Sequence, residues 1–331
     1  MKEIKKINLQ LFAEPNTNVT TDAGLSVENK THYDMTLIDE AAPLLVHDQF
    51  GQKRPIPKNG GKKIEFRKYA SFPKAMTPLT EGVTPDGRKL SVTAIEAEVK
   101  QYGDYVTLSD VLDLTAIDNN VVEATKACGR QAGLTLDTIT RNVLQSGTNV
   151  FYAGNKGDRA ELTADDKLTV ALVKKIVAFL KANNAPKIDG NYVAIIHPYA
   201  SHDIMSDPEW IDAHKYAAPE NIYEGEIGKV AGVRFVETSE AAIYTGGDCP
   251  NGLAVFGTLF IAAGAYGVTE ITGGGLQTII KQLGSSGVAD ALNQRSSVGW
   301  KAMKTAEILV EPYLVRAESC SSFSADVEEA N

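Results

Sequence analysis

Residues 107–147, TLSDVLDLTAIDNNVVEATKACGRQAGLTLDTITRNVLQSG, decide the fold. Their apolar positions recur three or four residues apart, which predicts that they share one face of a long α-helix. That face carries Ile117, Val121, Ala124, Cys128, Ala132, Leu136, Ile139 and Val143. The opposite face is predicted to be polar and exposed, with Glu123, Lys126, Arg130, Asp137 and Arg141.

The ends of this helix follow from capping chemistry. Asn120 followed by Glu123 has capping-box spacing, which predicts a start near Val121 after a short turn over residues 109–114. Gly147 is the predicted stop. At about 1.5 Å per residue the helix spans about 40 Å, several turns more than an average globular helix. We therefore interpret it as a beam to which the other parts of the chain attach.

Length and composition limit the class of protein. With 331 residues and 43% hydrophobic residues, the chain can bury a sizeable core as a soluble globular protein. A net charge of -9 argues against tight binding of phosphate backbones, so any contact with nucleic acid is expected to be weak. The three cysteines lie far apart, which excludes a disulfide framework and a CxxC pair and suits a reducing cytoplasm. No apolar run is long enough for a membrane span.

The first fifty residues are expected to need a partner. Lys2, Lys5 and Lys6 precede Ile7, Leu9, Leu11 and Phe12 much as in a signal peptide, but Asn8 and Gln10 interrupt the apolar run. We interpret this segment as an amphipathic arm. Residues 13–36 are polar and are expected to be extended or disordered until bound, whereas residues 35–50 are predicted to be helical.

A long hairpin is predicted before the helix. Ile64 and Phe66 alternate with charged residues as in a strand with one covered face. A second strand is predicted over residues 90–107, where a change of parity between Val92 and Ile95 predicts a bulge. Residues 71–88 between the arms are rich in Pro and Gly. Because an isolated two-stranded ribbon is marginally stable, we expect it to pack on something else, such as another subunit.

The remaining chain predicts a mixed α+β organisation without internal repeats. Thr163 and Asp166 form a second capping box before a helix that Asn183 and Asn184 close. A polar helical segment is predicted after His197-Pro198 and a Gly and Ser loop over residues 285–295. Strands are predicted at 192–196, 230–238, 253–271, weakly at 276–283, and as one final strand at 305–319.

One cluster, Ser201, His202 and Asp203 beside His197, could pass for a hydrolase or metal site. The two histidines are five residues apart, which separates them on a helix, and the serine lacks a GxSxG elbow. A surface helix is the favoured interpretation. The glycine runs at 246–247 and 273–275 lack the neighbours of a phosphate loop, so turns explain them. We predict no catalytic, cofactor-binding or metal-binding residues and no enzyme activity.

A basic patch lies on the predicted hairpin, where Lys62, Lys63, Arg67 and Lys68 stand beside Tyr69 and Phe72. Cations next to aromatic rings suit single-stranded nucleic acid. A solvated hairpin face, or cations that meet acidic residues of a neighbouring chain, explains the pattern more simply. The sequence leaves these alternatives open.

Four strings of sequence resemble a known family. They are INLQLFAE (residues 7–14), HPYASHDIMSDPEWIDAHKYA (197–217), ENIYEGEIGKVAGVRFVET (220–238) and GAYGVTEITGGG (264–275). With the predicted elements, they make the chain similar to major capsid proteins of tailed bacteriophages with the Hong Kong 97-type fold, in the branch typified by the phage N4 capsid protein. The resemblance covers nearly the whole chain and transfers no active site.

The resemblance implies a division of the chain by segment. Residues 1–54 would form an N-terminal arm, 55–107 an extended hairpin loop over an adjacent subunit, and 108–164 a peripheral domain with the spine helix. Residues 165–300 would form a mixed α/β axial domain, and 301–331 the return strand of the peripheral domain and a tail. An encapsulin-like nanocompartment shell with the same fold, and much less favourably a hydrolase, remain as alternatives.

The same resemblance implies partners. The subunit would form hexamers and pentamers of an icosahedral or prolate head around double-stranded DNA, assembled in the bacterial cytoplasm and located in the virion. A separate scaffold is expected because no coiled-coil segment precedes Met35, together with a portal and possibly decoration proteins. Contact with packaged DNA would be weak and no membrane is involved. The residues predicted to contact other subunits are Arg67, Lys68, Phe72, Arg88, Lys126, Arg130 and Arg141.

Overall fold

The computed structural model describes residues 37, 40–41, 45–69, 72–79, 81–84, 86–115, 119–217, 228–250, 252–285, 290–327 and 329–331. The predicted arm over residues 1–36 lies outside this part of the chain. Of the helix predicted over residues 35–50, the described residues Leu37, Glu40 and Ala41 are helical, whereas residues 47–50 form a turn.

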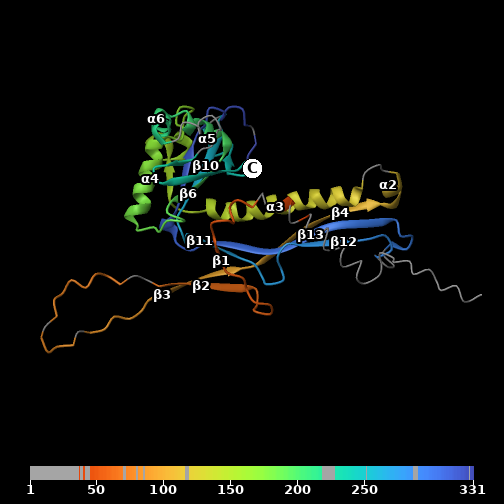
Figure 1. The fold of residues 1–331 in the computed structure, drawn as a ribbon, viewed down its shortest axis with the longest axis horizontal. Coiled ribbons are helices and arrows are strands. Elements are labelled where there is room, and N and C mark those ends of the chain that lie inside the picture. Colours follow the sequence, from red (N-terminus) through yellow and green to blue (C-terminus); the bar gives the residue numbers. More distant parts are fainter. Residues whose placement is uncertain are drawn as a thin grey trace, which may run out of the picture.

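The long helix α3 (Asn120–Gln145) runs through the molecule and has one sheet along its side and a second sheet at its C-terminal end, as Figure 1 shows. The first sheet has the order β1 (Gln52–Lys53), β11 (Tyr266–Thr269), β13 (Arg295–Ile308) and β12 (Gln277–Lys281), with β4 (Lys100–Ser109) also paired to β13. The second has the order β5 (Val150–Tyr152), β14 (Leu314–Ser319), β10 (Val255–Ile261), β6 (Tyr192–Ile196), β8 (Val233–Glu237) and β7 (Lys229–Val230), with β9 (Ile243–Tyr244) paired to β10.

The predicted long helix and the short turn before it are confirmed as α3 and α2 (Asp110–Thr115). The cap is one residue earlier than predicted, because the Asn119 side chain, not that of Asn120, accepts the Val122 N–H. The helix ends at Gln145, where the N–H groups of Ser146 and Gly147 donate to the carbonyls of Val143 and Leu144. The helix therefore ends two residues before the predicted stop at Gly147.

One face of α3 packs closely on the first sheet. Cys128, Ala132 and Leu136 are buried against β13 and against Leu37. A Cβ added at Gly129 would lie 2.8 Å from the Leu37 carbonyl oxygen, so the small residue allows this close approach. The small side chains of this face let the sheet lie close to the helix, and the Cys128 thiol donates to the Val298 carbonyl of β13 at 3.8 Å.

The predicted polar outer face of α3 is partly wrong. Asp137 is fully buried and Arg141 is 3% exposed, whereas Glu123 and Arg130 are exposed and Lys126 is half-buried. The reason is long-range packing, because residues 45–50 pass over the helix at Asp137 and the carbonyls of Glu240 and Asn331 accept hydrogen bonds from Arg141. Helical periodicity alone carries no information about such neighbours.

The second sheet holds the largest core. Strand β10 is buried at every residue, and helices α4 (Val170–Ala182), α5 (Pro198–Met205) and α6 (Pro208–Ala217) accompany this sheet in Figure 1. Helix α4 begins later than predicted, since Thr169 is its cap. Only half of the predicted capping box forms. Asp166 accepts both the N–H and the hydroxyl of Thr163 at 2.8 Å, but its own N–H donates to the Thr163 carbonyl, so these contacts close a turn ahead of the helix. Residues Asn183 and Asn184 follow its end as predicted.

The hairpin forms a two-stranded ribbon, β2 (Lys63–Tyr69) and β3 (Val92–Glu98), in continuous antiparallel register. The predicted bulge is therefore wrong. Val92 is 46% exposed while Ala97 is buried, so the change of parity marks an exposed valine and not an extra residue. The predicted second arm instead divides after β3, and β4 leaves the ribbon to pair with β13.

The end of the chain also differs from prediction. Residues 305–319 are not one strand, because β13 extends from Arg295 to Ile308 and β14 is a separate strand beyond the turn Glu311–Tyr313. The expected segment boundary at 300/301 thus falls inside β13. Strand β14 pairs with β10 and β5, so it joins the second sheet instead of returning to the sheet beside α3.

Candidate functional site

The ribbon carries an exposed apolar tip, defined here as residues 72–90. Its described large side chains are largely solvent-accessible, with Met76 80% and Leu79 77% exposed. Phe72, Val83 and Leu90 are exposed in the same way. Within the tip, Arg88 Nη1 donates to the Pro73 carbonyl at 3.2 Å, which holds the two sides together. Figure 1 shows the tip extending well away from both sheets. Such apolar surface on a projecting segment is typical of a contact with another molecule.

The base of the ribbon is anchored within the subunit. Phe66 and Ala97 are 4% and 1% exposed. A Cβ added at Gly267 of β11 would lie 2.8 Å from the Phe66 ring, so the ring lies directly on that strand. The Arg54 guanidinium also lies 5.8 Å from the centre of this ring. The ribbon is therefore fixed at its base and projects at its tip.

The basic residues of the ribbon are partly neutralised. Lys63 pairs with Glu96 across the strands at 3.3 Å, and Arg67 pairs with Glu65 at 3.1 Å. Hydrogen bonding and attraction from Glu65 raise the pKa of Arg67. Arg67 and Lys68 are both exposed, and Lys68 is next to Tyr69. This arrangement favours a solvated or protein-facing surface over a site that concentrates positive charge for a phosphate backbone.

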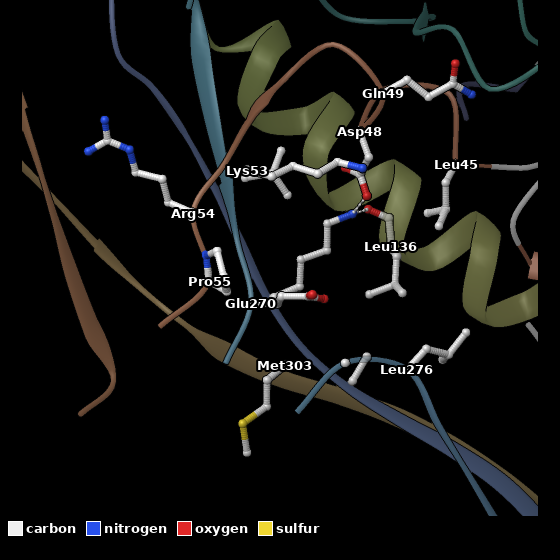
Figure 2. Close-up of a pocket in the computed structure, with 14 residues that line it drawn as sticks. Leu45, Asp48, Gln49, Lys53, Arg54, Pro55, Leu136, Glu270, Leu276 and Met303 are labelled. Carbon is white, nitrogen blue, oxygen red and sulfur yellow. Dashed lines mark hydrogen bonds and ion pairs between the residues drawn. The ribbon is translucent and has the colours of Figure 1, made fainter. Parts of the chain in front are cut away.

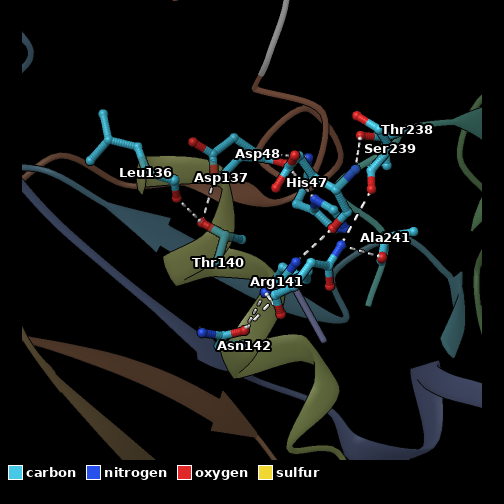
Figure 3. A network of polar contacts seen from close by, with 12 residues as sticks. His47, Asp48, Leu136, Asp137, Thr140, Arg141, Asn142, Thr238, Ser239 and Ala241 are labelled. Atoms are coloured by element: carbon cyan, nitrogen blue, oxygen red, sulfur yellow. Dashed lines mark hydrogen bonds and ion pairs between the residues drawn. The ribbon is translucent and has the colours of Figure 1, made fainter. Parts of the chain in front are cut away.

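Residues 45–50, called the strap here, are fastened to α3 and to the first sheet by polar contacts, and Figure 3 shows those with α3. The His47 N–H and Nδ1 lie 2.7 and 2.6 Å from the two carboxylate oxygens of Asp137. The Thr140 hydroxyl donates to Asp48 at 2.6 Å, and Lys304 of β13 forms an ion pair with Asp48. Tyr266 of β11 donates to the His47 carbonyl. The strap thus connects three elements that are distant in sequence.

A cavity of about 360 Å³ lies beside the strap, between α3 and the first sheet (Figure 2). Its lining is mostly apolar and includes Leu45, Leu136 and Met303. Asp48 and Lys304 lie at its wall and are already paired with each other. Burial lowers the pKa of Lys304, and the adjacent Asp48 carboxylate opposes that shift. Because Asp48 and Lys304 satisfy each other and also fasten the strap, we interpret the cavity as a feature of strap packing and not as a ligand site.

The predicted contact residues on α3 fall into two groups. Lys126 and Arg130 lie on the accessible side, where they pair with Glu123 at 2.9 Å and Glu40 at 3.0 Å. Arg141 does not lie on the accessible side of the helix. Its guanidinium is buried and donates to the carbonyls of Glu240 and Asn331 at 3.0 and 2.9 Å (Figure 3). Arg141 fastens segments of its own subunit.

The Ser201, His202 and Asp203 cluster does not assemble as a hydrolase site. The Ser201 hydroxyl is buried and donates to the Pro198 carbonyl and to Glu237, not to His202. Asp203 accepts the N–H and hydroxyl of Ser322 at 2.9 and 2.6 Å. A nucleophile needs a base within hydrogen-bond reach, and these contacts direct the serine elsewhere. The cluster attaches α5 to β8 and to the C-terminal tail.

His197 caps α5. Its Nδ1 accepts the Tyr199 N–H at 3.1 Å, so this nitrogen carries no proton. Burial lowers the pKa of His197 to about 4. His197 thus follows the end of β6 and also caps the start of α5. Within the described residues, no group of three His, Cys, Asp or Glu side chains could hold a metal ion, and no helix is long and apolar enough to cross a membrane.

Comparison with known proteins identifies the family. A family model described as phage capsid protein matches residues 92–313, about two thirds of the chain. The chain belongs to the phage capsid protein family. This capsid protein has a structural role, as a major subunit of a virion. No curated protein matches its sequence significantly.

Solved capsids share the fold of this capsid protein. A cyanophage Pam1 capsid chain aligns with a TM-score of 0.66 at 14% identity, over 86% of this chain and 92% of that one. A Ralstonia phage GP4 capsid chain aligns with a TM-score of 0.65 at 13% identity, over 82% and 87% of the two chains. A cyanophage P-SCSP1u capsid chain aligns with a TM-score of 0.63 at 14% identity, over 81% and 86%. The predicted mixed fold of a phage capsid protein is confirmed at this level.

Sequence reasoning missed the strap contacts in this capsid protein. One signal was present, because Val298, Trp300, Ala302, Lys304 and Ala306 have the same parity in β13 and all are buried. A lysine on the covered face of a strand implies a carboxylate partner. That partner, Asp48, is 256 residues away in the sequence, and no pattern near Asp48 or Lys304 indicates that the two residues pair.

Proposed function

We propose that this capsid protein forms the hexamers and pentamers of an icosahedral or prolate head that encloses double-stranded DNA. The observation that carries the proposal is the ribbon, whose base is anchored on β11 and whose tip exposes Phe72, Met76 and Leu79. An apolar segment fixed in direction but without cover in its own subunit is suited to lie over a neighbouring copy. If the same contact is repeated around a symmetry axis, the apolar tip of every copy is covered by a neighbouring subunit.

The proposal assigns roles to the segments by analogy with the Hong Kong 97-type fold and, within it, the phage N4-type branch. The ribbon is the extended loop and α3 the spine helix of a peripheral domain that includes the first sheet. The second sheet with α4, α5 and α6 is the axial domain. Strand pairing favours placing β12 and β13 in the peripheral domain and β14 in the axial domain, which revises the segment limits expected from the sequence.

The contact residues are proposed from exposure. Arg67, Lys68, Phe72 and Arg88 of the ribbon and Lys126 and Arg130 of α3 are accessible at least in part. They are proposed to meet neighbouring subunits, whereas Arg141 supports them indirectly by fastening α3 to residues 240 and 331. Weak contact with packaged DNA is consistent with the net charge of -9. Assembly in the host cytoplasm with separate scaffold, portal and possible decoration proteins completes the proposal.

Electron microscopy of the purified protein tests the assembly. We expect shells or ring-shaped capsomers that grow in number with protein concentration. A monomer that persists over a wide concentration range would contradict the proposal. Particles isolated from an infected host should contain double-stranded DNA. Particles with protein cargo and no DNA would instead indicate a nanocompartment shell.

A further inference from the structure

A cluster of exposed apolar side chains lies at the end of the molecule opposite the ribbon tip. We call it the distal patch, and it comprises Val106, Val111, Leu112, Leu114 and Leu292. Leu114 is 84% and Leu292 is 76% exposed. Figure 1 shows α2, which carries three of these residues, at the far end of α3 and β4. Apolar side chains gathered at one end of a soluble subunit indicate a surface that is covered by another segment or molecule.

The distal patch is held in a fixed conformation. The Asp110 N–H donates to the Gln294 carbonyl at 3.0 Å, which joins α2 to the segment that carries Leu292. The Leu112 N–H donates to the Ser109 hydroxyl at 3.2 Å, and the Asn120 side chain donates to the Leu112 carbonyl at 3.3 Å. A preformed apolar surface loses little conformational entropy when it binds a partner.

The course of the chain before the strap points to an occupant. Leu37 lies against Gly129, Glu40 pairs with Arg130 and Asp48 bonds to Thr140. These three described positions follow α3 in the direction of the helix. Traced backwards, this course leads towards Asn120, where α2 is attached. The remaining part of α3 from Gly129 to Asn120 is about 14 Å long at 1.5 Å per residue. Leu37, at which the described part of the chain begins, is therefore the end of this course that lies nearer to the distal patch.

The first residues of the chain have the matching chemistry. Ile7, Leu9, Leu11 and Phe12 supply apolar side chains, and Lys2, Lys5 and Lys6 supply positive charge. Asp110, the first residue of α2, adds a negative charge beside the apolar residues of this helix. A basic and apolar segment thus complements an acidic and apolar surface.

The connecting segment is long enough for this contact. Residues 13–36 would span about 27 Å on average as a flexible chain, and several times that when extended. Both lengths exceed the approximate 14 Å from Gly129 to the start of α3. A tether of this length gives the segment an effective concentration in the millimolar range at the patch of its own subunit. The ribbon tip of the same subunit, the other exposed apolar surface described here, lies at the opposite end of the molecule in Figure 1 and is a less accessible binding site for this segment.

We propose that residues 2–12 fold back onto the distal patch of their own subunit and cover it before assembly. The apolar side chains of Ile7, Leu9, Leu11 and Phe12 then pack on α2 and Leu292, with the lysines next to Asp110 of α2. This contact keeps the unassembled subunit from associating through the patch.

Hydrogen–deuterium exchange of the purified, unassembled full chain tests the contact. We expect the amides of residues 7–12 to exchange at least tenfold more slowly than those of a free peptide of the same sequence. Leu114→Asp should remove that protection, because it places a charge in the centre of the contact. Leu79→Asp, at a ribbon-tip leucine that is 77% exposed, is the matched control and should leave protection unchanged. Exchange at the free-peptide rate in the unaltered chain would overturn the proposal.

Thiol cross-linking supplies an independent measurement. Leu9→Cys and Leu114→Cys are combined with Cys249→Ser, which removes the one native cysteine that is not buried. A short thiol-reactive cross-linker should join positions 9 and 114 within one chain, and much more efficiently than in the control pair Leu9→Cys with Leu79→Cys. Leu292→Asp is a second patch variant that should reduce the yield. Cross-links only between chains would overturn the intramolecular contact and indicate exchange of the segment between copies.

Discussion

At the scale of single residues, the subunit is fastened by polar side chains that lie inside it. Lys304 is 6% exposed, and its ammonium contacts the Asp48 carboxylate and the Leu136 carbonyl. Removing a charged pair from water is costly, and the cost is offset only if each charge is satisfied. Thr140 supplies a further hydrogen bond to Asp48, so the Asp48 carboxylate and the Lys304 ammonium each have two partners. The strap is held by few residues, and each is expected to matter.

Replacing Lys304 tests this contact. Lys304→Met keeps the side-chain volume but leaves the Asp48 carboxylate buried without its cation. We expect the free energy of unfolding to fall by about 3 kcal/mol. The double variant Asp48→Asn with Lys304→Met should lose less than the single variant, since no uncompensated charge remains. Denaturant unfolding of the unassembled subunit measures both, and equal stability of the single and double variants would contradict the assigned contact.

His197 gives the subunit a dependence on pH. Its pKa is lowered to about 4 in the folded state from 6.5. Below pH 6.5 the unfolded chain binds a proton that the folded chain excludes, so the free energy of unfolding falls as the pH falls towards 4. The full decrease is about 3 kcal/mol, and the group contributes no pH dependence above that window.

The variant His197→Asn isolates this contribution. Asparagine also accepts the N–H of a helix start, so the cap of α5 is retained. Loss of the ring contact with Phe256, whose centre is 5.0 Å away, should lower stability by an amount that does not depend on pH. The difference between the two proteins should therefore narrow from pH 7 to pH 4. Denaturant unfolding at several pH values measures it, and a constant difference would contradict the assignment.

At the scale of elements, the sequence predicted what local patterns encode. The position of α3 followed from apolar spacing, and its cap was misplaced by one residue because Asn119 and Asn120 have the same chemistry. Strand β13 was recognised only at its end, since Ser296, Ser297 and Gly299 conceal the pattern. The pairing of β14 with β10 depends on residues 256–261, which nothing near residue 314 indicates.

The candidate contact surface was predictable to a similar extent. The family resemblance implied an extended hairpin loop over residues 55–107, and the exposure of Met76 and Leu79 agrees with it. Arg141 was assigned to the outer face because its helical position is polar. Its partners Glu240 and Asn331 are 99 and 190 residues away, so only the folded chain reveals that it is buried.

The accessible side of α3 leads to a prediction about assembly. Arg130→Glu reverses a charge whose side chain is 67% exposed and pairs with Glu40. Exposed pairs contribute little to stability, so the melting temperature should barely change. If Arg130 meets a neighbouring subunit, the yield of shells should fall severalfold. The matched control is Lys174→Glu on α4, which breaks an exposed ion pair with Glu209 of α6. Equal loss of assembly in both variants would indicate a general effect of net charge.

At the scale of the whole molecule, the subunit is a body with a projecting ribbon. Helix α3 contacts the first sheet along its length, and near its C-terminus Leu144 packs with Leu259 of β10 and Leu314 of β14 in the second sheet. The Arg316 guanidinium also donates to the Gln145 carbonyl at the last residue of the helix. Helix α3 therefore joins the two sheets through packed side chains and a hydrogen bond. The tip of the ribbon contributes no side chain to these cores. It is therefore the part of the chain whose removal is expected to affect folding least.

Deletion of residues 72–88 tests that separation. Tyr69 of β2 is directly opposite Val92 of β3, and five residues would remain to join them, which is a common length for a hairpin loop. We expect a folded, soluble subunit with an unchanged melting temperature, because the deleted side chains are exposed. Shell assembly should fall sharply, since the tip supplies contacts between chains. Circular dichroism and electron microscopy measure the two properties.

The control for this deletion is a variant that keeps the length of the tip and removes its apolar side chains. Phe72, Met76 and Leu79 are changed together to Ser, each of them more than half exposed. If contact between chains depends on these side chains, the triple variant should assemble as poorly as the deletion and fold equally well. Normal assembly of the triple variant would limit the role of the tip to its backbone and charges. Unfolding of either variant would show instead that the tip belongs to the core of its own subunit.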